Sequence, residues 1–297
     1  MMLQRLYRFT NCNKFLQTAV ARNIYSTYKK EYNIQNVGKL SMISSLTAMG
    51  TWGLIKSKSN EEKKIESTTS KTMKELLNEA DSLFDRGDYK GIYDLLSNYK
   101  DDKNVEILWR LSRAIYWMSE TANDIEARKL TYEGYDLLCT ALNIKEDHFA
   151  VHKWMSILLN KKSTLEGTKT LIKESYNIKK HMLRSMELNP DAMIFHMIGF
   201  WCYKISSLPW YQRKIASVIF EEPPVSSFEE ASMYLEKAEE IDPNFYSHNL
   251  LLLGKTYLKL NRKEDAIKYL KKTVEYPAKN DDDQKAKQEA QKILNNI

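Results

Sequence analysis

The sequence predicts an all-α protein, built as a tetratricopeptide-like solenoid of helical hairpins. Two observations support this: a recurring pattern of small and large residues typical of a helical repeat of about 34 residues, and a composition poor in turn-forming residues. Only nine glycines and six prolines occur among 297 residues, too few for the frequent turns of an all-β sandwich or barrel. With 43% hydrophobic and 11% aromatic residues, the chain can bury a substantial core.

The clearest copy of the pattern lies near the C-terminus. Gly254, Tyr257, Ala266 and Leu270 follow one another at spacings of 3, 9 and 4, and Pro277 comes shortly after them. Two antiparallel helices that cross closely need a residue without bulk where their backbones approach, and large residues one turn away. Gly254 and Ala266 meet the first requirement, and Tyr257 and Leu270 meet the second.

The preceding repeat carries the same pattern with an interruption. Ala231, Leu235 and Ala238 occupy the second-helix positions at spacings of 4 and 3, and Gly199 belongs to the first helix. Gly199 and Ala231 are 32 residues apart, whereas the matching pair in the last repeat is 12 apart. This difference predicts a 20-residue insert, residues 208–227, in the penultimate repeat.

Weaker copies lie upstream. Gly134, Leu138 and Ala141 repeat the 4 and 3 spacing, and residues 80–87 resemble a degenerate first unit. We therefore expect four to five hairpins. A final polar helix, with the acidic run Asp281–Asp283 at its N-terminus, should cap the solenoid because acids there complement the helix dipole.

Two cap signals refine the helix boundaries. Asn261, three residues before Glu264, is expected to cap the second helix of the last repeat. Ser226, three residues before Glu229, has the spacing of a capping box and is expected to end the insert.

Charge divides the chain into zones. Residues 1–60 contain nine basic residues and one acidic residue, and the first 30 residues have the composition of an amphipathic mitochondrial presequence. A disordered basic tail is the alternative. Residues 61–72 are expected to form a solvated linker, and residues 73–297 the helical repeat domain.

Residues 40–55 carry no charge. As a helix they would span about 24 Å, short of the roughly 30 Å hydrocarbon core of a bilayer. A linker is the simpler interpretation. Contact of residues 1–55 with phospholipid or a membrane surface is the alternative.

No catalytic motif is visible in the sequence. His148 and His152 are four residues apart on one predicted helix face, but no third metal ligand is spaced to join them. The three cysteines show no pairing or zinc-binding pattern. The sequence therefore predicts no enzyme activity, no metal, no cofactor and no nucleic-acid partner.

The predicted insert is rich in large apolar residues. Trp210 and Tyr211 stand beside Arg213 and Lys214, whereas the other aromatic residues at helical spacings are expected to be mostly core. Apolar groups in such numbers must be covered by the solenoid itself, by a partner or by lipid. Packing on the solenoid is the favoured expectation.

Four stretches resemble the regulator of microtubule dynamics family: LWRLSRA (108–114), AVHKWMSILL (150–159), GFWCYKISSLPWYQRKIAS (199–217) and NFYSHNLLLLGKTYLKL (244–260). The resemblance covers about residues 74–294. It implies a tetratricopeptide-like domain in proteins that associate with microtubules and spindle poles. It also includes a relative that is anchored in the outer mitochondrial membrane, tethers it to the endoplasmic reticulum and binds phospholipid.

Two functional hypotheses follow. The first is a non-catalytic protein that binds tubulin, microtubules or another protein, with Lys268, Lys271 and Lys272 meeting the acidic microtubule exterior; a merely solvated face is the alternative. The second is a mitochondrial membrane-contact or phospholipid-binding module. The leader favours a mitochondrial location, and the resemblance favours cytoplasm, microtubules and spindle poles.

Overall fold

The structure, a computed structural model, describes residues 72–220 and 223–297, and every regular element in these ranges is a helix. The predicted all-α class is confirmed. None of the helices described is long and apolar enough to cross a membrane. The helices are α3 (Met73–Asp85), α4 (Tyr89–Leu96), the 3-10 helix η2 (Ser97–Asp102), α5 (Val105–Thr121), α6 (Asp124–Ile144), α7 (Phe149–Glu166), α8 (Thr168–Leu188), α9 (Ala192–Ser206), α10 (Trp210–Ile219), α11 (Phe228–Ile241), α12 (Ser247–Lys259), α13 (Lys263–Glu275) and α14 (Asp281–Leu294).

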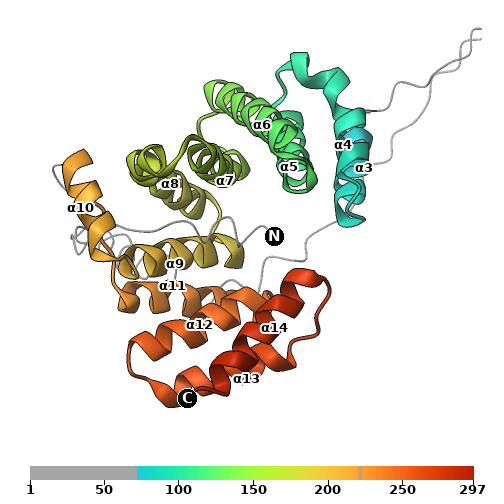
Figure 1. The fold of residues 1–297 in the computed structure, drawn as a ribbon. Coiled ribbons are helices and arrows are strands. Elements are labelled where there is room, and N and C mark those ends of the chain that lie inside the picture. The colour runs from blue at the N-terminus through green and yellow to red at the C-terminus, as the bar shows by residue number, and fades with distance from the viewer. Residues whose placement is uncertain (1–71, 221–222) are drawn as a thin grey trace, which may run out of the picture.

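The helices pack as successive pairs. α3 packs on α4, α5 on α6, α7 on α8, α9 on α11 and α12 on α13, and α14 closes the array against α12 and α13. Figure 1 shows the pairs following one another in an arc, with α5, α7 and α9 towards its inner side and α10 at its outer edge. The number of repeats and the status of residues 208–227 as an insert stay predictions.

The first described helix begins at a complete capping box. Thr72 Oγ1 accepts a hydrogen bond from Glu75 N at 3.3 Å, and Thr72 N donates to Glu75 Oε2 at 2.9 Å. Two of the orphan donors at the helix start are thereby satisfied. The predicted leader, and the predicted linker apart from Thr72, lie outside the described residues.

Helices α3 and α12, each the first helix of its pair, end in the same way. Gly87 follows α3 and Asn261 follows α12, and both are left-handed, with φ values of 74° and 59°. After α12, Asn261 N donates to Leu258 O at 3.2 Å and Arg262 N donates to Tyr257 O at 2.9 Å. This is the hydrogen-bond pattern of a Schellman motif. The predicted role of Asn261 was therefore wrong: it ends α12, and α13 has no side-chain cap.

The start of α11 differs from the prediction by one residue. Ser227, not Ser226, is the cap, because its Oγ accepts a hydrogen bond from Glu230 N at 3.0 Å. Ser226 Oγ donates to Glu230 Oε2 at 2.6 Å, so both serines support the same turn. The acidic start of α14 is as predicted, with Asn280 capping Asp283 N.

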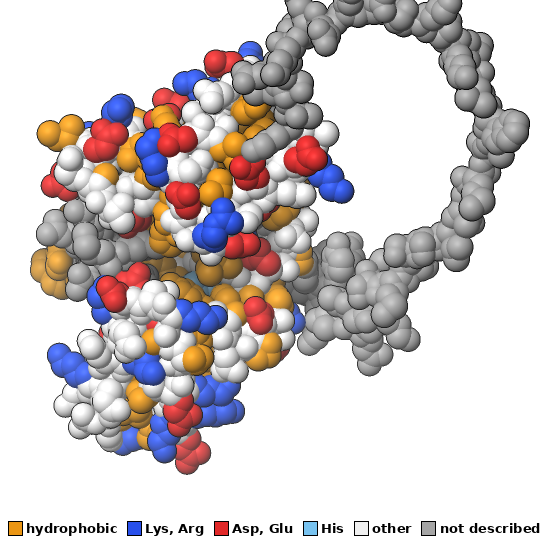
Figure 2. All heavy atoms as spheres, turned by 90° about the vertical axis from the view of Figure 1, so that its right-hand side faces the viewer, with side chains coloured by type: hydrophobic (Ala, Val, Ile, Leu, Met, Phe, Trp, Pro, Cys, Tyr) orange, Lys and Arg blue, Asp and Glu red, His pale blue; other side chains and the backbone are white. Residues whose placement is uncertain are grey.

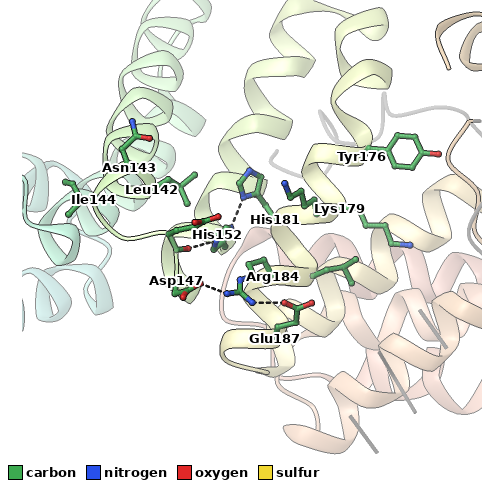
Figure 3. A pocket seen from close by; sticks show the side chains of 13 residues that line it. Leu142, Asn143, Ile144, Asp147, His152, Tyr176, Lys179, His181, Arg184 and Glu187 are labelled. Carbon is green, nitrogen blue, oxygen red and sulfur yellow. Dashed lines mark hydrogen bonds and ion pairs between the residues drawn. The ribbon is translucent and has the colours of Figure 1, made fainter. Parts of the chain in front are cut away.

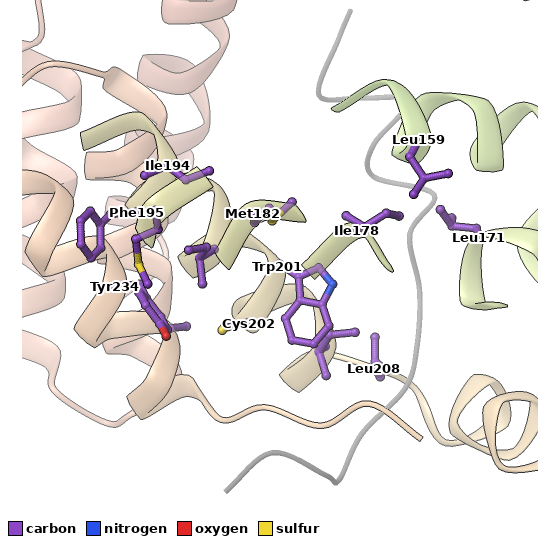
Figure 4. Close-up of a cluster of buried hydrophobic side chains, with 14 of the residues drawn as sticks. Leu159, Leu171, Ile178, Met182, Ile194, Phe195, Trp201, Cys202, Leu208 and Tyr234 are labelled. Carbon is purple, nitrogen blue, oxygen red and sulfur yellow. The ribbon is translucent and has the colours of Figure 1, made fainter. Parts of the chain in front are cut away.

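The largest apolar cluster joins the middle of the arc. Figure 4 shows Ile178 from α8, Ile194 and Trp201 from α9, and Tyr234 from α11 meeting in one core. Each such side chain contributes about 1.5 to 3 kcal/mol when fully buried. The aromatic residues expected in the core differ in their burial: Tyr116 and Trp201 are buried, whereas Trp109, Trp117, Trp154 and Phe200 are half-buried.

Candidate interaction surfaces

The predicted small residues lie where paired helices touch. A Cβ atom placed on Gly254 would lie 2.7 Å from Leu270 Cγ and 3.4 Å from the carbonyl oxygen of Ala266. A Cβ atom on Gly199 would lie 2.7 Å from Leu235 Cγ and 3.2 Å from the Ala231 carbonyl oxygen. The two pairs, α12 with α13 and α9 with α11, therefore approach in the same manner.

The remaining repeat positions are also internal. Gly134 on α6 faces Ile115 and Leu158, each with a methyl carbon 3.1 Å from a would-be Cβ. Tyr257 Oη donates to Glu236 Oε1 at 2.7 Å. The other positions named from the pattern are fully buried: Leu138, Ala141, Ala231, Leu235, Ala238, Ala266 and Leu270. These residues pack hairpins and offer no binding surface. Their equivalence across repeats stays a prediction.

An aromatic and cationic ridge runs along α5. Trp109, Arg113 and Trp117 are spaced by four residues and so share one helix face. The Arg113 guanidinium carbon lies 4.9 Å from the centre of the Trp109 ring and 3.7 Å from that of Phe84. The Trp117 ring stacks on Tyr89 at 5.5 Å. We call Trp109, Arg113 and Trp117 the α5 ridge.

Two donors of the ridge have no acceptor in the part of the chain that the structure describes. They are Nε of Arg113 and Nε1 of Trp117. A buried donor without a partner costs about 1 to 3 kcal/mol. Figure 2 shows hydrophobic side chains gathering in the hollow between the upper and lower parts of the molecule.

Carboxylates hold the base of the ridge. Asp81 accepts hydrogen bonds from Arg110 at 2.8 Å and from Arg113 at 2.7 Å, and Glu106 pairs with Arg110 and His148. Burial acts to raise the pKa of Glu106, but hydrogen bonds from His148, Trp109 and Arg110 lower it to about 2. This network fixes the ridge rigidly on α3 and α5.

A cleft of about 1080 Å³ opens beside α6, α7 and α8. Figure 3 shows His152 and His181 meeting in it. His152 Nε2 lies 2.8 Å from the Glu146 carbonyl oxygen and must donate to it, so its Nδ1 accepts from His181 Nδ1 at 2.8 Å. Burial lowers the pKa of His181 to about 4 and also lowers that of His152. The two histidines form a neutral pair joining α7 to α8.

The positive charges around the cleft are largely compensated. Arg184 bridges Asp147 and Glu187. Lys179, whose side chain is only 4% exposed, pairs with Glu230 at 3.2 Å and lies 4.3 Å from the centre of the Trp201 ring. The cleft therefore has little net positive charge to attract an anion.

The basic residues predicted on α13 do not form a uniform patch. Lys268 and Lys271 are exposed, but Lys272 is half-buried and pairs with Glu239 at 3.4 Å. Glu264 precedes Lys268 by four residues, and Glu275 follows Lys271 by four, so acids share their helix face. This surface has the mixed charge of a solvated helix.

The apolar residues of α10 are not covered as expected. Trp210 is 74% exposed, Tyr211 48%, and Val218 83%. Arg213 and Lys214 are exposed beside them. The favoured expectation of packing on the solenoid is wrong for these three apolar residues, because only the opposite face of α10 meets the core.

Sequence reasoning missed the links between distant segments. Asp81 and Arg110 are 29 residues apart, as are His152 and His181, and no local spacing reveals such a contact. The α5 ridge did leave a signal, because its three residues recur every fourth position. Across the described residues, no group of three or more His, Cys, Asp or Glu side chains is placed to hold a metal.

Comparison with known proteins decides the family. The family model described as "Regulator of microtubule dynamics protein 1-3" matches residues 76–297. The chain belongs to the regulator of microtubule dynamics family. Regulator of microtubule dynamics protein 1 of Mus musculus is 45% identical over 229 residues, covering 76% of this chain and 75% of the mouse protein. Protein 3 of Xenopus laevis is 32% identical over 191 residues, covering 64% of this chain and 41% of the frog protein.

Two solved structures are similar to this chain at much lower sequence identity. TTC0263, a thermophilic TPR protein from Thermus thermophilus, gives a TM-score of 0.48 at 15% identity, covering 73% of this chain and 97% of that one. MamA from Desulfovibrio magneticus RS-1 gives 0.44 at 14% identity, covering 70% and 96%. The pairing of helices in this chain stands on its own contacts.

Proposed function

We propose that this chain is a non-catalytic interaction protein that associates with microtubules through its helical domain. The association with microtubules is supported by the names of its relatives, which are regulators of microtubule dynamics. Binding without catalysis is supported by the way polar groups are used: His148, the pair His152–His181 and the buried pair Lys179–Glu230 join helices to one another.

The α5 ridge is the proposed contact surface, and its combination of tryptophan and arginine on one helix face carries the proposal. Tryptophan and arginine dominate the binding energy of protein interfaces because they combine large apolar area with directional polar groups. Arg113 places a positive charge between Trp109 and Trp117 on this face of α5, which suits a partner that presents carboxylates. An acidic protein surface, such as the microtubule exterior, has this chemistry.

Helix α13 is the weaker surface. Lys268 and Lys271 share their face with acidic residues, so they attract an acidic partner less than an unmixed basic stripe would. The proposal therefore assigns the main contact to the α5 ridge.

Co-sedimentation with microtubules tests this function. The full chain and a chain lacking residues 1–60 are compared at low and high salt. We expect both to pellet with microtubules, and both to bind more weakly at high salt because exposed charges are screened. If only the full chain pellets, the basic leader is the binding element and the proposal for the helical domain fails.

A mitochondrial membrane-contact role is the second candidate. It is favoured by residues 1–60, with nine basic residues against one acidic residue, and by the uncharged stretch 40–55. Fluorescent tagging at the C-terminus, with and without residues 1–60, separates the two locations. A mitochondrial signal that disappears without the leader supports targeting, whereas unchanged microtubule or cytoplasmic signal in both cases contradicts it.

A further inference from the structure

Helix α10 displays an apolar stripe to solvent. Successive helical residues are about 100° apart, so Trp210, Tyr211, Ile215 and Val218 fall within an arc of about 140°. Their exposed fractions are 74%, 48%, 42% and 83%. We call these four residues the α10 stripe. An exposed group of large apolar side chains on a folded protein usually marks a contact with another molecule or with lipid.

The opposite side of α10 is held in the fold. Gln212 and Ala216 are buried, and Phe220 packs edge-on against Tyr176 of α8 at 5.1 Å. Arg213 Nε donates to the Leu208 carbonyl oxygen at 3.0 Å. The helix is therefore already formed and oriented, and binding through the stripe requires little further ordering.

The basic residues of α10 lie within and beside the stripe. α10 contains Arg213 and Lys214 and no acidic residue, and Lys214 lies between Trp210 and Val218 around the helix. Arg213 and Lys214 therefore place positive charge beside the exposed apolar side chains of α10.

We infer that α10 is a membrane-surface helix that docks the domain on an anionic lipid bilayer. Tryptophan and tyrosine favour the interfacial region of bilayers, and apolar residues bordered by lysine and arginine are typical of helices that lie in that region. Trp210 and Val218 enter the bilayer boundary, and Lys214 meets the lipid phosphates. The proposal is independent of the microtubule association.

The geometry favours a lipid surface over a protein groove. A helix received by a protein groove presents apolar anchors at positions i, i+3, i+4 and i+7, whereas the positions that follow Trp210 at these spacings are Arg213, Lys214 and Ser217. The helix also lies at the outer edge of the arc (Figure 1), where a broad flat surface can reach it. A bilayer needs only the exposed side.

Hydrogen exchange of the full chain, followed by mass spectrometry, tests the docking at α10 itself and so separates it from any binding by the leader. The chain is measured alone, with phosphatidylcholine vesicles, and with vesicles that also contain phosphatidylserine. We expect peptides from residues 208–220 to exchange more slowly only with the phosphatidylserine vesicles. Exchange unchanged by these vesicles, or slowed equally by neutral ones, overturns the proposal.

Two matched variants sharpen the test. Trp210→Ser should raise the vesicle concentration for half-maximal protection roughly tenfold or more, because it removes a large apolar area that enters the bilayer boundary on binding. Ile125→Ser changes an exposed apolar residue outside the stripe, 84% exposed on α6, and should have no effect. Both chains are checked for an unchanged melting temperature. Equal protection in the Trp210→Ser chain contradicts the inference.

A second copy of the chain is the alternative binding partner for the α10 stripe. If the stripe mediates self-association, peptides 208–220 become protected without vesicles as protein concentration rises, and the molar mass by light scattering rises with it. That outcome would overturn the lipid assignment.

Discussion

Gly254 and Leu270 lie so close that no side chain fits between their helices. A Cβ atom on Gly254 would lie 2.7 Å from Leu270 Cγ and 2.9 Å from its Cδ2, well inside normal van der Waals contact. Because Gly199 and Leu235 have the same relationship, the close approach of α12 to α13 and of α9 to α11 depends on the absence of a side chain.

Alanine at Gly254 should therefore destabilise the fold. The gain of up to about 1 kcal/mol that alanine brings in an exposed helix is outweighed by overpacking, which costs about 1 to 3 kcal/mol. Gly254→Leu should cost on the order of 2 to 4 kcal/mol by the same mechanism. Urea unfolding of the full chain measures both changes.

Gly134→Ala is the matched control. Its new Cβ would meet only methyl groups of Ile115 and Leu158 at 3.1 Å, and these can shift more readily than Leu270 Cγ and the nearby backbone. The loss should be clearly smaller than for Gly254→Ala. A Gly254→Leu chain as stable as the parent would show that the assigned register of the last hairpin is wrong.

The buried pair Lys179 and Glu230 gives a second prediction. The Lys179 side chain is 4% exposed and that of Glu230 13%. Glu230→Gln leaves the Lys179 charge buried without its partner, which costs about 3 to 5 kcal/mol for a fully buried pair. Adding Lys179→Met should restore much of this loss, because the unpaired charge is then gone.

A double-mutant cycle by urea unfolding measures this coupling. Strictly additive losses in the two variants would mean that Lys179 and Glu230 do not stabilise each other, contrary to the contact in the structure.

Acid should weaken the fold through His181 and His196. Burial lowers the pKa of His181 and of His196 to about 4, from an ordinary value of 6.5. Between these values the unfolded chain binds protons that the folded chain does not, so stability falls as pH falls from about 6.5 to about 4. Above pH 7 these groups should have no effect. The combined loss is on the order of 2 to 5 kcal/mol.

His181→Asn tests how much His181 contributes to the loss of stability at low pH. The Asn side-chain amide can donate to His152 Nδ1 as His181 Nδ1 does, but it does not titrate. Urea midpoints measured from pH 7.5 to 4.5 should therefore fall less steeply in the variant. Identical pH profiles would exclude His181 as a source of the acid sensitivity.

The packing pattern could be predicted because a close helix crossing restricts the size of the residues at the contact. Where two helices cross, Gly254 and Ala266 must be small and Leu270 must be large. The same size requirements recur in the predicted repeats. Asn261 was misassigned for a physical reason as well. Asparagine suits both a helix start, through its side chain, and a left-handed residue after a helix end, so its type alone does not decide.

The surfaces were less predictable. The sequence shows that α10 is rich in apolar residues, but only the structure tells which side of the helix the core covers. Likewise, Asp81 on α3 pairs with Arg110 and Arg113 on α5. Residues so far apart in the sequence leave no periodic pattern from which their contact could be predicted. The mixed charge around Lys268 and Lys271 was visible in the sequence, as acids at four-residue spacing.

The α5 ridge as a microtubule contact is the central functional claim, and one comparison tests it most directly. The full chain, Trp117→Phe and Trp210→Phe are co-sedimented with microtubules over a range of tubulin concentrations. Trp117→Phe keeps an aromatic ring beside Tyr89 but removes part of the aromatic surface of the ridge. Because a tryptophan at the centre of an interface commonly contributes about 1 kcal/mol or more, the Kd should rise roughly three- to tenfold. Trp210→Phe, on α10, should bind like the parent. Unchanged affinity in a stably folded Trp117→Phe chain, or an equal loss in both variants, would contradict the assignment of this ridge.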